Sequence, residues 1–137
     1  MQQQEQHEAG FTLLEIMVVL VIIGVLAALV APRFLERADD AKVQAARVQM
    51  TNIGQALKLY RLQHGKYPDS SQGLQVLATP GADGKRYMDA VPKDPWGNAY
   101  IYLAPGVHGD FDILSYGADG KAGGSGIDAD IGNWQKP

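Results

Sequence analysis

Cysteine is absent from this chain of 137 residues, so no disulfide can brace its loops. Basic residues are few: 12 Lys and Arg stand against 15 Asp and Glu, and none form a cluster interleaved with aromatic residues. The net charge of −3 therefore predicts no nucleic-acid partner. Only three histidines occur, and none belongs to a recognisable nucleophile–base motif. We therefore expect one small domain that is not an enzyme.

A long apolar run lies near the amino terminus. Residues 16–31 contain no charged or strongly polar side chain. Extension back to Phe11 gives about 20 residues, the length that an α-helix needs to cross a bilayer. The run is typical of a membrane span or a secretory signal. Residues 1–10 contain Glu5 and Glu8 but no Lys or Arg, which fits a secretory signal poorly, although small residues at the end of the run leave that alternative open.

Glu15 lies inside this apolar segment, where a carboxylate is costly and usually functional. One interpretation is a side chain that snorkels at the membrane edge. The other is assembly, because cleavage after Gly10 would create an α-amino group on Phe11. Glu15 of one subunit can then pair with that amine on a neighbouring subunit, and a buried pair of this kind can fix the register between them.

A second, amphipathic helical pattern follows the apolar run. Pro32 can kink the helix, and the mixed charges of residues 33–42 indicate either a solvated face or salt bridges between subunits. Beyond them, apolar residues recur at alternating spacings of three and four: Val43, Ala46, Met50, Ile53, Leu57 and Tyr60. This stripe predicts a helix that packs on the chain's own sheet rather than a coiled coil of several copies. Gly65 and Pro68 predict its end.

The rest of the chain predicts a loop-rich region, since most of the 16 glycines and 7 prolines occur there. A short helix is expected after Pro68, with Ser70 or Ser71 as its N-cap. Residues 99–104 and 111–115 are strand-like and are separated by a turn. The predicted fold is α+β: one long amino-terminal helix packed on a small antiparallel sheet.

Residues 115–134 have the composition of a metal-binding loop. They combine three carboxylates with hydroxyl groups, backbone carbonyls and many glycines. Calcium takes six to eight oxygen ligands in flexible loops, and glycines let the backbone turn its carbonyls inward. The loop contains no His or Cys, which argues against zinc, and its spacing is not that of an EF-hand. On composition alone, a calcium site and a solvated Gly/Asp turn remain equal alternatives.

The segment from Gly10 through Phe11 to Glu15, followed by the apolar run, resembles the class III signal of type IV pilins and pseudopilins. The resemblance implies a pilin-like fold, cleavage between Gly10 and Phe11 by a prepilin peptidase, and N-methylation of Phe11. Leaders of this family usually carry basic residues, and this one does not. A cytoplasmic amino terminus therefore follows from the resemblance and not from the positive-inside rule.

Three further motifs narrow the resemblance to the major pseudopilins of type II secretion, the core protein G family. They are Tyr67-Pro68, Gln72-Gly73-Leu74 and Asp94-Pro95-Trp96-Gly97, and the tail is also similar. Type IVa pilins usually close their carboxy-terminal region with a cysteine pair, which this chain lacks. The alternatives are a type IV pilin for adhesion, motility or DNA uptake, and a membrane-anchored calcium-binding module that does not polymerise.

The resemblance implies a structural subunit that polymerises from the bacterial inner membrane into a periplasmic pseudopilus and drives export of folded proteins across the outer membrane. It implies as partners further copies in a helical filament, minor pseudopilins, the prepilin peptidase and the inner-membrane assembly platform. The predicted organisation is a cleaved leader (1–10), a single membrane helix (11–31), a periplasmic amphipathic helix (32–64) and a periplasmic carboxy-terminal region (65–137).

The resemblance also implies that the loop binds calcium. Asp119 and Asp128 match the family's side-chain ligands, and the backbone carbonyls of Tyr116 and Lys121 match its main-chain ligands. Ser125 is a weaker match, and Asp130 is either a further ligand or a structural carboxylate. The ion would then brace the loop in place of a disulfide.

Overall fold

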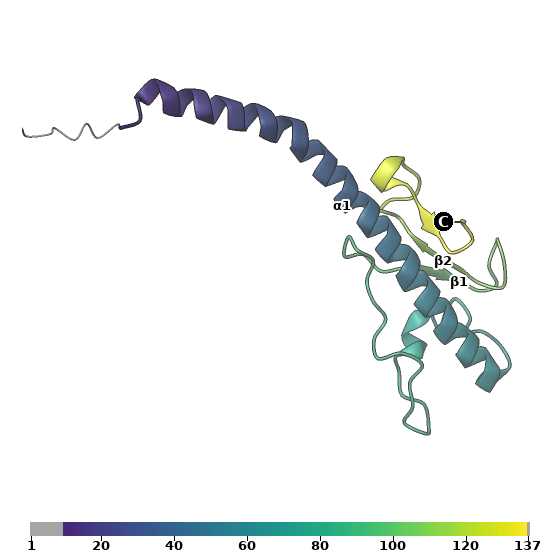
Figure 1. Cartoon of the computed structure of the whole chain (residues 1–137). Helices are drawn as coiled ribbons and strands as arrows, with labels where there is room; N and C mark the ends of the chain where they lie inside the picture. The colour runs from purple at the N-terminus through teal and green to yellow at the C-terminus, as the bar shows by residue number, and fades with distance from the viewer. Residues whose placement is uncertain (1–9, 137) are drawn as a thin grey trace, which may run out of the picture. The chain divides into compact units, whose positions relative to one another are not determined.

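A computed structural model describes residues 10–136 of the chain. Within these residues the elements are, in order, α1 (Leu13–His64), η1 (Leu74–Leu77), β1 (Ile101–Leu103), β2 (Asp112–Ser115), η2 (Gly126–Asp128) and β3 (Ile131–Gly132) (Figure 1). The two η elements are single turns of 3-10 helix. The chain divides into two compact units, and the boundary falls inside α1 between Arg37 and Ala38.

The first unit contains the apolar part of α1. The helix begins at Leu13, and the Thr12 hydroxyl caps it by accepting a hydrogen bond of 3.2 Å from the Glu15 N–H. Its most apolar window has a mean hydropathy of 3.1, so by length and composition α1 can cross a membrane. Pro32 lies within the helix and does not end it. The helix therefore begins two residues after Phe11, where the predicted span starts, and its crossing of a membrane stays a prediction.

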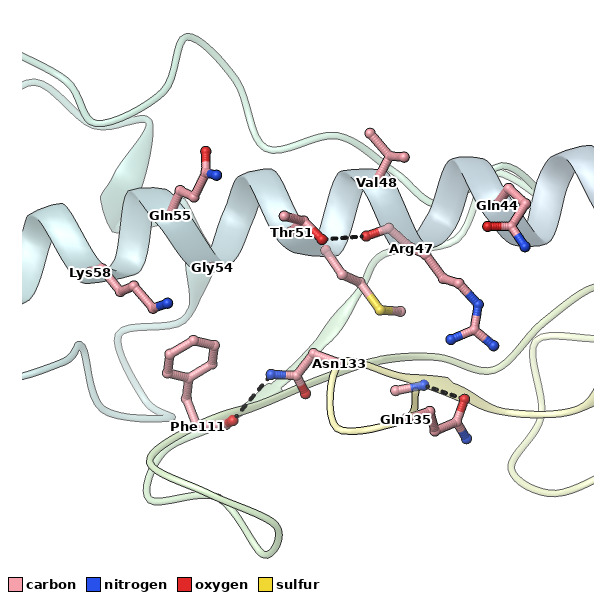
Figure 2. A pocket seen from close by; sticks show the side chains of 12 residues that line it. Gln44, Arg47, Val48, Thr51, Gly54, Gln55, Lys58, Phe111, Asn133 and Gln135 are labelled. Carbon is pink, nitrogen blue, oxygen red and sulfur yellow. Dashed lines mark hydrogen bonds between the residues drawn. The ribbon is translucent and has the colours of Figure 1, made fainter. Parts of the chain in front are cut away.

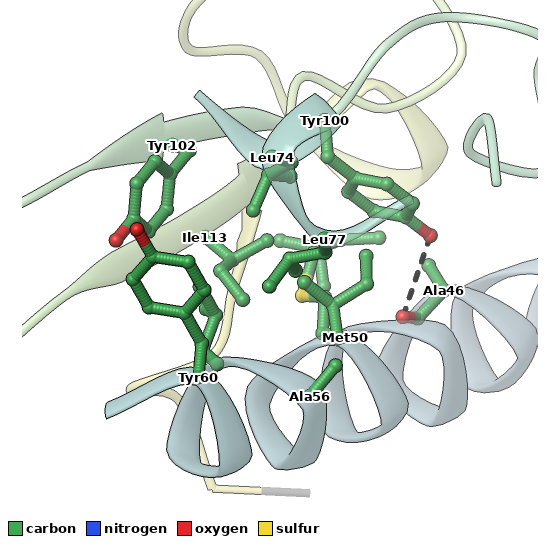
Figure 3. Packing of buried hydrophobic residues seen from close by; sticks show 12 residues of the cluster. Ala46, Met50, Ala56, Tyr60, Leu74, Leu77, Tyr100, Tyr102 and Ile113 are labelled. Atoms are coloured by element: carbon green, nitrogen blue, oxygen red, sulfur yellow. Dashed lines mark hydrogen bonds between the residues drawn. The ribbon is translucent and has the colours of Figure 1, made fainter. Parts of the chain in front are cut away.

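The second half of α1 presents the predicted apolar stripe to the core. Five members of the stripe are buried, namely Ala46, Met50, Ile53, Leu57 and Tyr60, while Val43 packs at the edge of the cluster (Figure 3). The helix ends where predicted, because Gly65 adopts a φ of 77° and its N–H bonds the Arg61 carbonyl at 2.7 Å. This half of α1 therefore packs on its own domain.

The sheet that faces this stripe has three antiparallel strands in the order β1-β2-β3. Tyr102 of β1 lies opposite Ile113 of β2, and Ser115 of β2 lies opposite Ile131 of β3. Ile113 is fully buried in the core beside Leu77 of η1 (Figure 3). The sequence predicts the first two strands, with broader bounds, but not β3.

Two tyrosines tie the sheet region to neighbouring segments. The Tyr102 hydroxyl donates to the Pro68 carbonyl at 2.6 Å. The Tyr100 hydroxyl donates to Gln49 Oε1 of α1, and the Ala46 carbonyl lies 3.5 Å from the same hydroxyl (Figure 3). Burial raises the pKa of Tyr102 to about 12 and also raises the pKa of Tyr100. Both phenols therefore stay protonated and keep donating near neutral pH.

The predicted N-cap of the short helix is wrong. Gly73 precedes η1, and no side chain caps it. The Ser71 hydroxyl instead donates to Asp69 Oδ1 at 2.5 Å, and the Ser70 hydroxyl bonds the backbone of Ala104. Asp69 also accepts from the Gln72 N–H at 2.9 Å and so closes a turn before the helix. Local side-chain bonds of this kind compete with capping.

Candidate functional site

The amino-terminal motif lies at the start of the first unit. Gly10 and Phe11 precede α1, and the Phe11 side chain is 84% exposed. The bond between them lies outside the helix. Glu15 is exposed in the first turn of α1, and residues 10–136 offer it no ion pair. The predicted leader lies outside the described residues except for Gly10, so its cleavage remains a prediction.

The carboxy-terminal loop connects β2 to β3 and closes on itself through main-chain contacts. The Ala118 N–H donates to the Ile127 carbonyl at 2.9 Å. Gly117 has a φ of 76°, and a Cβ there would lie 2.6 Å from the same carbonyl oxygen. A Cβ on Gly124 would lie 2.7 Å from the Asp128 carbonyl oxygen. Only glycine fits at these two positions, because the opposing arms approach too closely for a side chain.

The three predicted carboxylates have different surroundings within this loop. Asp119 is exposed, and its Oδ1 accepts the Lys121 N–H at 3.0 Å. Asp128 ends η2, is half-buried, and accepts no side-chain hydrogen bond from the described residues. Both oxygens of Asp130 accept the Gly123 N–H at 3.1 Å. These bonds order the loop, and the choice between ligand and structural carboxylate for Asp130 stays a prediction.

All the predicted metal ligands in the loop are oxygen atoms. The predicted main-chain ligands are the carbonyls of Tyr116 and Lys121, and Ser125 precedes η2 with an extended backbone. Across residues 10–136, no three acidic or histidine side chains converge on a metal-sized site. A cation here would therefore rely on two carboxylates and on main-chain oxygens. Calcium is a cation that accepts such a mixed set of oxygen ligands.

A buried carboxylate that the sequence did not reveal supports the start of this loop. Asp94 is only 4% exposed, and its Oδ1 accepts the N–H groups of Trp96 and Asn98 at 3.1 and 2.8 Å. Its Oδ2 accepts the Ser115 hydroxyl at 2.6 Å. The Ser115 oxygen in turn accepts the Gly117 N–H at 3.1 Å. The Asp-Pro-Trp-Gly motif signalled a turn, but nothing local indicated its partner 21 residues away.

The residues that follow β3, here called the tail (133–136), contact the sheet beyond the far end of the loop. Asn133 accepts the Ile113 N–H at 2.9 Å and donates to the Phe111 carbonyl at 3.4 Å (Figure 2). The Trp134 ring stacks on His108 with the ring centroids 3.9 Å apart. The Nδ1 atom of His108 lies 2.9 Å from the buried carboxylate of Asp112, on β2. The histidine therefore links Trp134 of the tail to the sheet.

Figure 2 also shows the groove between α1 and the tail. Arg47 and Lys58 lie on its helix side, and Phe111 lies opposite Gly54. No histidine or carboxylate lines the groove, and the Thr51 hydroxyl donates to the Arg47 carbonyl at 3.0 Å. The described lining residues therefore form no nucleophile–base pair with a histidine or a carboxylate.

Comparison with protein families gives two matches that together span most of the chain. Residues 6–31 match the prokaryotic N-terminal methylation motif. Residues 33–134 match the family described as type II secretion system (T2SS), protein G. The two matches meet near Pro32, and the loop and the tail fall inside the second.

Individual relatives agree with these matches. The chain is 49% identical over 139 residues to the type II secretion system core protein G of Pseudomonas aeruginosa, covering 96% of this chain and 98% of the relative. It is 44% identical over 136 residues to that of Vibrio cholerae, covering 94% and 93%. Its structure is similar to the crystal structure of the major pseudopilin from enterohaemorrhagic Escherichia coli, with a TM-score of 0.63, 33% identity, and coverage of 73% of this chain and 92% of the other.

Proposed function

The chain belongs to the family of type II secretion system protein G, and from this premise we propose that it polymerises at the bacterial inner membrane to drive export of folded proteins across the outer membrane. It is a structural subunit of the type II secretion pseudopilus. One observation supports the proposal most: the methylation motif, the apolar helix and the globular region occur together over nearly the full length of the relatives.

We propose that processing and assembly use the same few residues. Cleavage by the prepilin peptidase between Gly10 and Phe11, followed by N-methylation, leaves an amine close to the start of α1. Glu15 lies in the first turn of that helix, and residues 10–136 offer it no cation. In a bundle of apolar helices, the amine on a neighbouring copy is the natural partner for this carboxylate.

We also propose a location and partners for the subunit from its family membership. The apolar part of α1 anchors the chain in the inner membrane before assembly, and the globular unit lies in the periplasm. Minor pseudopilins and the inner-membrane platform then contact a filament made of many copies. The proposed role is structural, as the names of the core protein G relatives and of the major pseudopilin suggest.

The transport function can be tested in the native host by deletion of the gene. We expect the deletion strain to retain its exoproteins in the periplasm while its twitching motility stays normal. A plasmid copy of the gene should restore secretion. The opposite result, loss of twitching with normal secretion, would identify a type IV pilin instead.

We also propose that the carboxy-terminal loop binds calcium. Asp119 and Asp128 provide the side-chain oxygens, and Tyr116, Lys121 and Ser125 provide further oxygens, while Asp130 orders the loop through Gly123. When bound, the ion neutralises the two carboxylates and cross-links the arms of a loop that no disulfide can brace. The donor set and the glycine-lined approach of the arms support this proposal.

Calcium should raise the melting temperature of the processed chain in detergent micelles, and chelator should lower it. At a calcium concentration 100 times the Kd, mass action adds about 2.7 kcal/mol to the free energy of unfolding. Asp119→Ala should abolish this calcium-dependent rise. Asp83→Ala is the matched control, because Asp83 Oδ1 accepts the Lys85 N–H at 3.0 Å, as Asp119 accepts that of Lys121.

The control separates loss of a turn from loss of a ligand. Both substitutions remove the same side-chain bond to the backbone, so both should lower the melting temperature slightly in chelator. Only Asp119→Ala should remove the response to calcium. An equal calcium response in wild type and Asp119→Ala would exclude Asp119 as a ligand.

A further inference from the structure

We propose that the turn formed by residues 94–98 holds the first arm of the carboxy-terminal loop in the conformation that binds the cation. The inference rests on the proposed calcium site. It assigns a positioning role to Asp94, Ser115 and Asn98, none of which is a predicted ligand. Their contacts reach the loop on both sides of Asp119.

The first contact is a buried relay of hydrogen bonds. The Ser115 hydroxyl donates to Asp94 Oδ2 at 2.6 Å and accepts the Gly117 N–H at 3.1 Å. Ser115 is fully buried and Asp94 is 4% exposed, so water cannot replace either bond readily. A hydrogen bond to a buried charged acceptor is among the stronger ones in proteins. The relay therefore ties the carboxylate to the main chain at the entrance of the loop.

The relay acts where the two arms of the loop meet. Gly117 packs so closely on the opposite arm that a Cβ would lie 2.6 Å from the Ile127 carbonyl oxygen and 2.9 Å from that of Ala129. Asp128 lies between those two residues. A shift of Gly117 therefore moves the backbone that carries one predicted ligand against the backbone that carries the other.

The second contact comes from the same turn. Asn98 is held by two bonds to Asp94, because its N–H donates to Asp94 Oδ1 and its carbonyl accepts the Asp94 N–H, both at 2.8 Å. The Asn98 side-chain nitrogen lies 3.2 Å from where a Cβ of Gly120 would be. Gly120 directly follows Asp119. The turn thus reaches Gly117 through Ser115, and its Asn98 side chain lies near Gly120. These two glycines flank the segment that contains Asp119.

The contacts from the turn favour calcium binding because the loop is then ordered when the chain folds. The entropy cost of ordering the loop is therefore not subtracted from the free energy of calcium binding. If only a fraction of the molecules holds the loop in its binding conformation, the apparent affinity for calcium is the intrinsic affinity multiplied by that fraction. The turn has its own fixed geometry, since Asp94 holds three hydrogen-bond donors around its carboxylate. It can therefore order the loop in the absence of the ion.

Calcium titration calorimetry of the full processed chain in micelles tests the inference. Ser115→Ala should weaken calcium binding about tenfold, the size expected for loss of one hydrogen bond to a charged group. Ser115→Thr, which keeps the hydroxyl, should restore much of the affinity. Ser70→Ala is the matched control, because that hydroxyl also bonds backbone, at Ala104, but away from the loop. It should leave calcium affinity unchanged.

Asn98→Ala provides a second test that does not disturb the buried relay. The side chain is exposed, so the variant should fold normally, with a calcium affinity roughly two- to threefold weaker. Unchanged calcium affinity in Ser115→Ala and Asn98→Ala, with normal binding by the wild type, would overturn the positioning role.

Amide hydrogen exchange in chelator separates this role from the calcium site itself. Ser115→Ala should increase exchange at residues 117–120, and Ser70→Ala should not. If the wild type binds no calcium, the metal proposal fails, and these exchange rates still decide whether the turn orders the loop. Equal exchange at residues 117–120 in wild type and Ser115→Ala would overturn the inference.

Discussion

Replacement of Glu15 by alanine is expected to abolish pseudopilus assembly and leave the globular unit folded. The carboxylate lies among apolar residues of α1 and contributes nothing to the core, which begins at Ala46 within the second unit. In the filament, the variant leaves the Phe11 amine of a neighbouring subunit buried without a partner. Removal of one member of a buried pair costs about 3–5 kcal/mol. That penalty recurs at every subunit, so long filaments should not form.

Electron microscopy of filaments sheared from cells that overproduce the processed chain would measure this effect. Tryptophan fluorescence of the same variant reports the fold, since Trp96 and Trp134 both lie in the second unit. Glu36→Ala is the matched control, because it removes an exposed carboxylate from the same helix beyond the apolar run. Normal filaments from Glu15→Ala would contradict the proposed pairing and favour the snorkelling interpretation.

Leu57→Ala is expected to cause a large loss of stability. Leu57 is fully buried against the sheet, so truncation removes apolar contacts and leaves a cavity. Substitutions of this kind cost about 2–5 kcal/mol, a large share of the free energy of unfolding of a small domain. The melting temperature, followed by tryptophan fluorescence in chelator, should fall by several degrees or more.

Leu62→Ala is the control for this prediction. Leu62 lies on the same helix but is 81% exposed, so its truncation should change the free energy of unfolding by about 0.5 kcal/mol or less. A similar loss in both variants would mean that the exposed face of α1 is covered. Neither variant alters a predicted calcium ligand, so both should keep their response to the ion.

The apolar run and the helical stripe could be identified from the sequence because their signals are local. A stretch of about 20 apolar residues predicts a span by length alone. The spacing of Ala46, Met50 and Leu57 predicts which helix face is buried, because the α-helix has a fixed period. The end of α1 at Gly65 is also a local signal, because glycine adopts a positive φ without the steric cost of a Cβ.

The tertiary structure decided the features that depend on distant partners. The strand β3 has two residues, one of them a glycine, so its sequence carries no periodic signal and only its pairing with β2 defines it. The predicted cap at Ser70 or Ser71 was wrong because both hydroxyls bond other groups, one of them 34 residues away.

The loop shows the same division most clearly. Its composition and its family resemblance predicted a calcium site at Asp119 and Asp128, and that site remains a proposal. The supporting bond from Asp94 to Ser115 spans 21 residues, and only the folded chain brings the two groups together. Residue types determine which chemistry is possible, whereas the order of the loop depends on contacts between residues far apart in the sequence, which no local pattern encodes.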